Sequence, residues 1–94
     1  MLYAIHCTDK PDSADIRAAN RPAHLKYVKS HANQVVLAGP TQTDDLKEMN
    51  GSLLVMEFID KSAAEFFANN DPYAVAGLFE RVSIRPFKMV FPAV

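Results

Sequence analysis

The stretch SLLVMEFIDKSAAEFF, residues 52–67, passes from a predicted strand directly into a predicted helix. Residues 52–59 are apolar at almost every position, as in a strand that is buried on both faces. The polar run DKS then opens a helix, whose apolar face is formed by Ala63, Phe66 and Phe67. These residues predict one strand–helix unit of an α+β domain.

Three more strands are predicted outside this stretch. Each is rich in apolar, β-branched and aromatic residues and is bounded by turn residues. They cover residues 2–8, 35–41 and 81–91. With a helix after the first strand, the order of elements becomes β-α-β-β-α-β. This order is the split βαβ arrangement of ferredoxin-like α+β domains, and we expect a single domain over residues 1–94.

The helix between the first two strands contains a proline. Asp12 or Ser13 can cap the start of this helix. Pro22 must interrupt or kink it, because the proline ring removes one amide donor and crowds the carbonyl four residues earlier. Beyond the proline, apolar residues at helical spacing predict the face that packs on the sheet. They are Leu25, Val28 and Ala32.

The apolar residues of the third strand alternate between its two faces. Leu53 and Val55 point to one face, whereas Leu54, Met56 and Phe58 point to the other. Helices cover one face of such a sheet, and a monomer rarely exposes a large apolar patch on the other. We therefore expect a homodimer or a higher homo-oligomer, held by the face with Leu54, Met56 and Phe58. The alternative is that a loop or the C-terminal tail covers this face.

Charge and cysteine content exclude several classes of protein. Ten Lys and Arg residues against eleven Asp and Glu residues give a net charge of −1, which argues against nucleic acid as a partner. Cys7 is the single cysteine and cannot form an internal disulfide. The apolar N-terminal run is too short for a signal peptide or a membrane span. We expect a cytoplasmic protein without a membrane partner.

No metal or cofactor site is predicted. His24 and His31 are seven residues apart, which is about 10.5 Å along a helix and too far for one ion. His6 and Cys7 are adjacent in a strand and point to opposite faces, so Cys7 is expected to be a small core residue. The chain has only 3 glycines, and none forms a nucleotide-binding loop.

A stripe of basic residues runs along the predicted first helix. Arg17, Arg21, His24 and His31 share one side, next to the apolar face. Guanidinium groups bind carboxylate or phenolate, and imidazole exchanges protons near neutral pH, so the stripe suits an anionic ligand. The alternative is a half-exposed histidine on the basic edge of a helix.

Three further residues allow both a structural and a functional interpretation. Asp71, followed by Pro72, is typical of a helix N-cap, although its second oxygen could orient an imidazole. Ser52 begins a strand and could donate a hydrogen bond to a ligand. Tyr73 could line a pocket or pack on the second helix.

Several segments, in this order and at these spacings, resemble the YciI-like (YCII-related) family over nearly the whole chain. They are Tyr3-Ala4-Ile5, Asp9-Lys10-Pro11, Arg17, Arg21-Pro22-Ala23-His24, Gly39-Pro40, Gly51-Ser52-Leu53, Asp71-Pro72-Tyr73, Ala76-Gly77-Leu78-Phe79 and Ile84-Arg85-Pro86-Phe87. The resemblance implies a ferredoxin-like fold that pairs into a dimeric α+β barrel. It also implies an active site centred on a histidine and an aspartate, which correspond to His24 and Asp71. One relative is a dehydrochlorinase of chlorinated hydroxyhydroquinones, and muconolactone isomerases share the barrel.

The leading hypothesis is a cofactor-independent lyase, isomerase or dehydrochlorinase that acts on a small hydroxylated or carboxylated cyclic compound. His24 would be the general acid or base, Asp71 its orienting partner, and Arg17 or Arg21 the anion clamp. Ser52 and Tyr73 would contact the ligand. Two alternatives remain open: a non-catalytic ligand-binding or accessory dimer, and a regulatory or structural dimer without a ligand.

Overall fold

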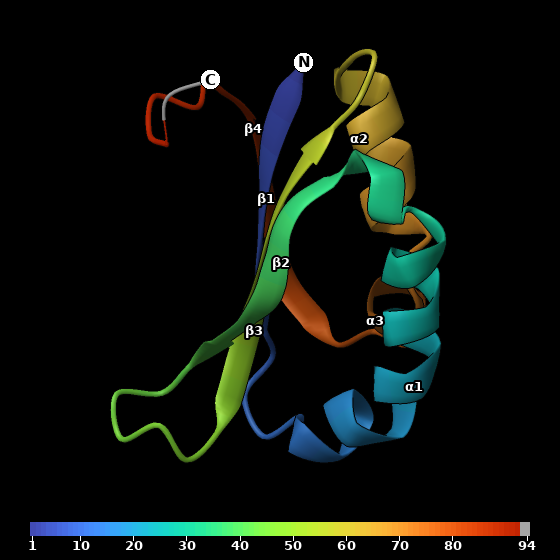
Figure 1. Cartoon of the computed structure of the whole chain (residues 1–94). Helices are drawn as coiled ribbons and strands as arrows, with labels where there is room; N and C mark the ends of the chain where they lie inside the picture. The colour runs from blue at the N-terminus through green and yellow to red at the C-terminus, as the bar shows by residue number, and fades with distance from the viewer. Residues whose placement is uncertain (93–94) are drawn as a thin grey trace.

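The strands and helices follow one another in the predicted order. The computed structural model describes residues 1–92, so residues 93 and 94 of the predicted domain lie outside it (Figure 1). Its elements are β1 (Leu2–Asp9), α1 (Ala14–Ser30), a 3₁₀ turn (Ala32–Gln34), β2 (Val35–Gln42), β3 (Met49–Glu57), α2 (Lys61–Asn69), α3 (Pro72–Val75) and β4 (Phe79–Phe87). This order confirms the ferredoxin-like α+β prediction. None of the helices in the described part is long and apolar enough to span a membrane.

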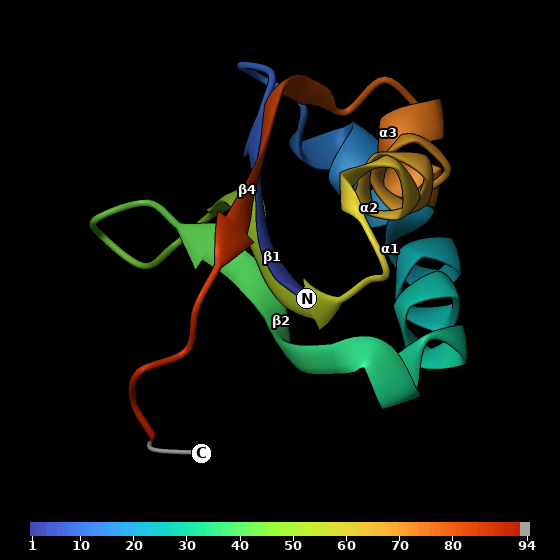
Figure 2. The same ribbon diagram turned by 90° about the horizontal axis from the view of Figure 1, so that it is seen from above.

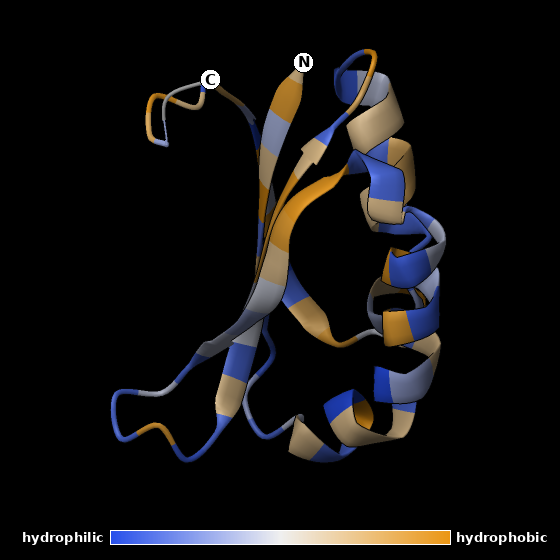
Figure 3. Cartoon of the chain, in the orientation of Figure 1, coloured by the Kyte–Doolittle hydropathy of each residue, from blue (hydrophilic) through white to orange (hydrophobic). Residues whose placement is uncertain are grey.

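The four strands form one antiparallel sheet in the order β2-β3-β1-β4. All three helices lie on the same face of this sheet, as Figure 2 shows from above. The molecule therefore has two layers, and the other sheet face carries no helix. Strands β1, β2 and β3 carry long apolar stretches, whereas α1 is largely hydrophilic (Figure 3).

The core lies between the sheet and the helices. Leu54, Met56 and Phe58 are all 5% exposed or less, and they pack with Ile5 and Phe67 beneath α2. The prediction that this face of β3 holds an oligomer together is therefore wrong, because it is the helix-covered face of the same chain. Both faces of β3 are apolar, so its own pattern did not indicate which one the helices cover.

The helix-free face of the sheet carries the opposite set of apolar residues. Leu53 lies on it beside Leu37 and Val55, which pair across β2 and β3. Leu37 is 49% exposed, Leu53 38% and Phe87 43%, whereas Val55 is only 6% exposed. We refer to Leu37, Leu53, Val55 and Phe87 as the open face.

Helix α1 continues through its proline. Pro22 lies inside the helix, so of the two predicted outcomes the interruption does not occur, and the change of direction after the first turns in Figure 1 agrees with the kink. The residues here are exposed, so water can bind the carbonyl that the proline leaves free. Leu25 is 47% exposed, and Arg17 is the one buried residue of α1. The predicted apolar face of this helix is therefore largely wrong.

Two local details differ from the sequence predictions. Ser13 is the N-cap of α1, but its hydroxyl donates to the carbonyl of Lys10 at 2.6 Å and caps no helical amide. Strand β4 ends at Phe87 rather than at Phe91, whose side chain is 86% exposed. The chain after Phe87 thus leaves the sheet.

Candidate active site

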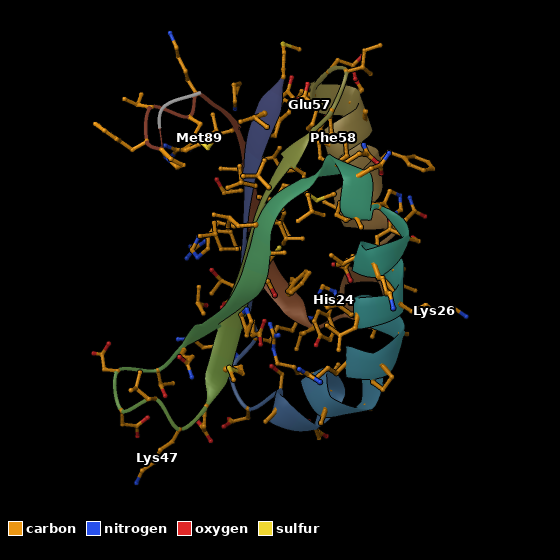
Figure 4. The ribbon with its side chains drawn as sticks, in the orientation of Figure 1. His24, Lys26, Lys47, Glu57, Phe58 and Met89 are labelled. Carbon is orange, nitrogen blue, oxygen red and sulfur yellow. The ribbon has the colours of Figure 1, made fainter. Side chains whose placement is uncertain are left out.

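His24 and Asp71 meet between α1 and the start of α3. The Nδ1 atom of His24 lies 2.8 Å from Oδ1 and 3.1 Å from Oδ2 of Asp71. The two side chains are 12% and 4% exposed. Figure 4 shows His24 on the side of α1 that faces the sheet, while Lys26 projects outward. The helix thus turns the imidazole inward, onto a carboxylate 47 residues later in the chain.

The carboxylate of Asp71 is fixed by the helix that it caps. Its Oδ1 accepts the backbone N–H of Tyr73 at 2.9 Å, and Pro72 occupies the first turn, where no amide is needed. Asp71 is therefore an N-cap, as its local sequence predicts. The same carboxylate also accepts from the imidazole, so the structural and the functional interpretation do not compete.

This hydrogen bond decides which nitrogen of His24 is available. A carboxylate only accepts, so Nδ1 carries the proton and, in the neutral ring, Nε2 carries the lone pair. Nε2 makes no hydrogen bond to the described residues. Every buried polar side-chain atom in that part of the chain has a partner. Nε2 is therefore open to solvent or to a ligand.

Tyr73 packs its ring against this imidazole. The two ring centroids are 4.0 Å apart with an interplanar angle of 16°. Tyr73 is 1% exposed, and burial raises the pKa of its phenol, against the opposing charges of Arg17 and Arg21. The stack closes one face of the His24 ring and leaves Nε2 at its edge.

Arg17 occupies the inner end of the same helix stripe, seven residues before His24. Its Nε and Nη2 atoms form a bidentate pair with Asp9 at 2.8 and 2.9 Å. Nη2 also donates to the carbonyl of Gly51 at 2.8 Å and to the hydroxyl of Ser52 at 3.0 Å. Burial would lower the pKa of Arg17, but the pair with Asp9 raises it, so this cation is permanent. Ser52 is thus an acceptor for Arg17 and is itself buried.

A cleft of about 700 Å³ opens beside this arginine. It lies between the turn after β1, the first turns of α1 and the hairpin between β2 and β3. His24 is not part of its lining, and the charged lining comprises four cations and four carboxylates: Lys10, Arg17, Arg21, Lys47, Asp9, Asp12, Asp15 and Glu48. Arg21 is exposed, and no ion pair forms on it within the described residues. His24 lies one helical turn beyond Arg21.

Two residues of this region were missed by the sequence reasoning. Asp9 looked only like the end of a strand, although a carboxylate eight residues before Arg17 across a short turn was the available signal. Gly51 contributes its carbonyl, and a Cβ at this position would clash with the carbonyl oxygen of Cys7. Cys7 is 2% exposed and belongs to the core, as predicted. The described residues contain no cluster suited to a metal ion.

The solved structures to which this chain is similar include a near relative and more distant ones. The 5-chloro-2-hydroxyhydroquinone dehydrochlorinase TftG of Burkholderia phenoliruptrix AC1100, in complex with 2,5-dihydroxybenzoquinone, superposes with a TM-score of 0.87. It is 36% identical, and the match covers 94% of both chains. An antibiotic biosynthesis monooxygenase superposes with a TM-score of 0.57 at 12% identity, which shows a shared fold alone.

Comparison with protein sequences identifies the family. Protein YciI of Escherichia coli O6:H1 (strain CFT073) is 39% identical over 98 residues, covering 97% of this chain and 100% of the relative. An uncharacterized protein of Haemophilus influenzae is 34% identical with the same coverage. The family model for the YCII-related domain matches residues 1–88. This chain therefore belongs to the YciI-like, YCII-related family.

Proposed function

We propose that this protein is a cytoplasmic, cofactor-independent enzyme that transfers protons with His24 and Asp71. Its substrate is a small hydroxylated or carboxylated cyclic compound, and its reaction is that of a lyase or isomerase of the dehydrochlorinase type. The observation that supports this most directly is the Nδ1 contact with Asp71, which leaves Nε2 as an accessible base. The 36% identity to a dehydrochlorinase supports the same class of substrate.

The pair is suited to elimination from a ring that bears two hydroxyl groups and a halide. Nε2 of His24 takes one hydroxyl proton and delivers it to the ring carbon that carries the halide, which becomes tetrahedral. Nε2 then takes the proton of the second hydroxyl, and the electron pair left on that oxygen forms a carbonyl. The neighbouring double bond shifts, and chloride leaves with the pair of the carbon–chlorine bond. Asp71 stabilises the imidazolium, which then releases its proton to water. Stopping after the first transfer, from oxygen to ring carbon, would make the reaction an isomerisation.

Arg21 is the residue that we assign to binding the substrate anion. Two of the three nitrogens of Arg17 are already bonded to protein groups, whereas Arg21 is exposed at the cleft. Lys10 lines the same cleft. A guanidinium next to the base would bind a carboxylate or phenolate bidentately and hold its ring near Nε2.

We also propose that two copies of the chain pair through the open face. The helices leave this face uncovered, and an apolar groove of about 660 Å³ on it is lined by Leu2, Val36 and Phe87, among others. Leu53→Lys should convert the dimer to a monomer in light scattering at micromolar concentration. Ile59→Lys is the matched control, because Ile59 is 84% exposed in a loop. A monomeric wild type would contradict the proposal.

The function is tested with 5-chloro-2-hydroxyhydroquinone under anaerobic conditions, since hydroquinones oxidise in air. The purified protein should release chloride and form the quinone, and His24→Gln should abolish both. A thermal shift assay with the same compound measures binding separately. Stabilisation without turnover across chlorinated and unchlorinated rings would contradict the enzyme and favour a ligand-binding module.

A further inference from the structure

We infer that Arg17 and Tyr73 form a positioning pair, in which Arg17, anchored by Asp9, holds the Tyr73 ring against His24. This inference rests on the proposed role of His24 as the base. It gives Arg17 a role that differs from binding the substrate anion. It also makes Asp9, which touches neither His24 nor Asp71 in this structure, part of the support for the reaction.

The first step of the argument is the fixed position of Arg17. Its guanidinium makes four contacts at 3.0 Å or less with Asp9, Gly51 and Ser52, so β1, β3 and α1 are joined at one group. The side chains of Arg17 and Asp9 are 9% and 7% exposed. A bidentate, desolvated pair of this kind has a defined geometry, which a single surface contact lacks.

The second step is the contact between this cation and an aromatic ring. The Cζ atom of Arg17 lies 4.7 Å from the centroid of the Tyr73 ring, which is within the range of a cation–π interaction. Tyr73 is 1% exposed, so water does not screen this contact strongly. Arg17 thereby limits where the tyrosine ring can lie.

The third step is that Tyr73 contacts both His24 and Asp71. Its ring stacks on His24 at 4.0 Å, and its backbone N–H bonds Oδ1 of Asp71 at 2.9 Å. The hydrogen bond to Asp71 fixes one nitrogen of the imidazole, while the stack restricts rotation of the ring plane. A shift of Tyr73 would therefore misdirect Nε2 even with His24 and Asp71 intact.

The inference is tested by ¹⁵N NMR of the His24 ring, which needs no substrate. In the wild type, Nδ1 should appear protonated and Nε2 unprotonated. In Arg17→Lys and Tyr73→Leu the ¹⁵N chemical shifts of the two nitrogens should move toward a common average, because the two tautomers of a less restricted ring exchange. Lysine cannot reproduce the planar fork of arginine, and leucine has no ring to stack. Tyr73→Phe keeps the ring and should restore the wild-type pattern. The signals of His31, which does not contact Tyr73, serve as the internal reference.

Kinetics separate positioning from substrate binding. Arg17→Lys should lower kcat by about 100-fold with little change in KM, since misplacing a reacting group costs rate rather than affinity. Tyr73→Leu should do the same, and Tyr73→Phe should recover most of the loss. If Tyr73→Leu does not fold, Asp9→Asn is the substitute, because it weakens the ion pair that anchors Arg17. It should average the ¹⁵N chemical shifts of the two His24 nitrogens in the same way.

Two results would overturn the inference. An increase in KM at constant kcat in Arg17→Lys would make this arginine a substrate contact, through its remaining nitrogen. Unchanged His24 signals in Arg17→Lys would show that the arginine does not position the imidazole. Because the NMR experiment is independent of turnover, positioning can fail while the enzyme is active, and it can hold where no substrate is turned over.

Discussion

Two histidines on the same side of α1 have different environments. His24 and His31 are seven residues apart, about 10.5 Å along the helix. The Nδ1 atom of His24 contacts the carboxylate of Asp71, which belongs to another element. The Nδ1 atom of His31 lies 2.9 Å from the carbonyl of Tyr27, within its own helix. The ring of His31 meets Phe67 edge-on at 4.9 Å.

The difference lies in what packs opposite α1. The His24 end faces the N-terminus of α3, where a capping carboxylate is already fixed. The His31 end faces α2 and an aromatic cluster with Tyr27 and Phe67, which has no acidic member. Two histidines on the same side of the helix thus differ in role: His24 is a candidate base, and His31 is the C-cap of α1. Each prediction below removes or emphasises one side of this contrast.

The largest effect is expected from removing the charge opposite His24. Asp71→Asn should lower kcat by about 10⁴-fold. The amide oxygen, at the Oδ1 position, can still accept from Tyr73 and Nδ1, but asparagine has no charge to stabilise the imidazolium. Its NH₂, at the Oδ2 position 3.1 Å from Nδ1, also opposes a protonated Nδ1. Stability should change little, because asparagine caps helices about as well as aspartate. Asp60→Asn, at the equivalent cap of α2, is the matched control and should leave kcat unchanged. A fully active Asp71→Asn would make Asp71 only a cap.

Removing Arg17, which forms the buried ion pair with Asp9, should lower the free energy of unfolding. Arg17→Met should reduce the free energy of unfolding by about 3–5 kcal/mol, because it leaves the carboxylate of Asp9 buried without a partner. The double variant Asp9→Leu with Arg17→Met should recover a large part of this loss. Arg21→Met, on the exposed side, should stay within about 0.5 kcal/mol. Urea unfolding measures all three, and a loss below about 1 kcal/mol in Arg17→Met would contradict the buried pair.

The buried thiol of Cys7 should make the stability of the protein sensitive to alkaline pH. Burial, with the charges of Asp71 and Asp9, raises the pKa of Cys7 to about 12, against the opposing charge of Arg17. The unfolded thiol ionises at about pH 8.5, so between that value and the folded pKa only the unfolded state loses the proton. The free energy of unfolding should therefore fall as pH rises, by up to about 1.4 kcal/mol per pH unit.

Urea titrations between pH 8 and pH 10 check this slope, and Cys7→Ala should reduce it. The same burial should protect the native thiol from iodoacetamide at pH 8 until urea unfolds the chain. Rapid labelling of the folded protein would show that the Cys7 thiol is reached by solvent.

The smallest effect is expected from replacing His31, which packs in the aromatic cluster with Tyr27 and Phe67. His31→Gln should lower the free energy of unfolding by about 0.5–1.5 kcal/mol through the lost edge-on contact with Phe67. Its kcat should stay within about twofold of the wild type, since His31 touches neither Asp71 nor Tyr73. A loss of kcat comparable to that of His24→Gln would remove the contrast between the two ends.

Local patterns predicted most of the fold. Residues 52–59 and the caps at Asp60 and Asp71 depend on nearby sequence alone, and the structure has them close to where they were expected. The face of β3 that meets the helices was not predictable, because both faces are apolar. The effect of Pro22 depends on its lying on the exposed side of α1, which requires the tertiary structure.

The candidate site was only partly visible in the sequence. Helical spacing places Arg17, His24 and His31 on one side of α1, and the family resemblance points to Asp71. Spacing could not distinguish His24 from His31, since their partners lie on separate elements. The contact of Asp9 with Arg17 depends on how the turn after β1 folds back, and Gly51 acts through a backbone carbonyl that no side-chain motif reveals.

The hydrophilic character of α1 affects the order in which the elements of the protein unfold. This helix is attached by the Arg17–Asp9 ion pair, the His24–Asp71 contact and a hydrogen bond from the hydroxyl of Tyr27 to the carbonyl of Phe67, and Tyr27 and Val28 are only partly buried against the core. Elements with few buried apolar contacts open locally at lower free energy than the central strands. The amides of α1 should therefore exchange with deuterium before those of β1 and β3. The proposed base lies on this helix, so on warming any activity of His24 should be lost at a lower temperature than that at which the sheet unfolds.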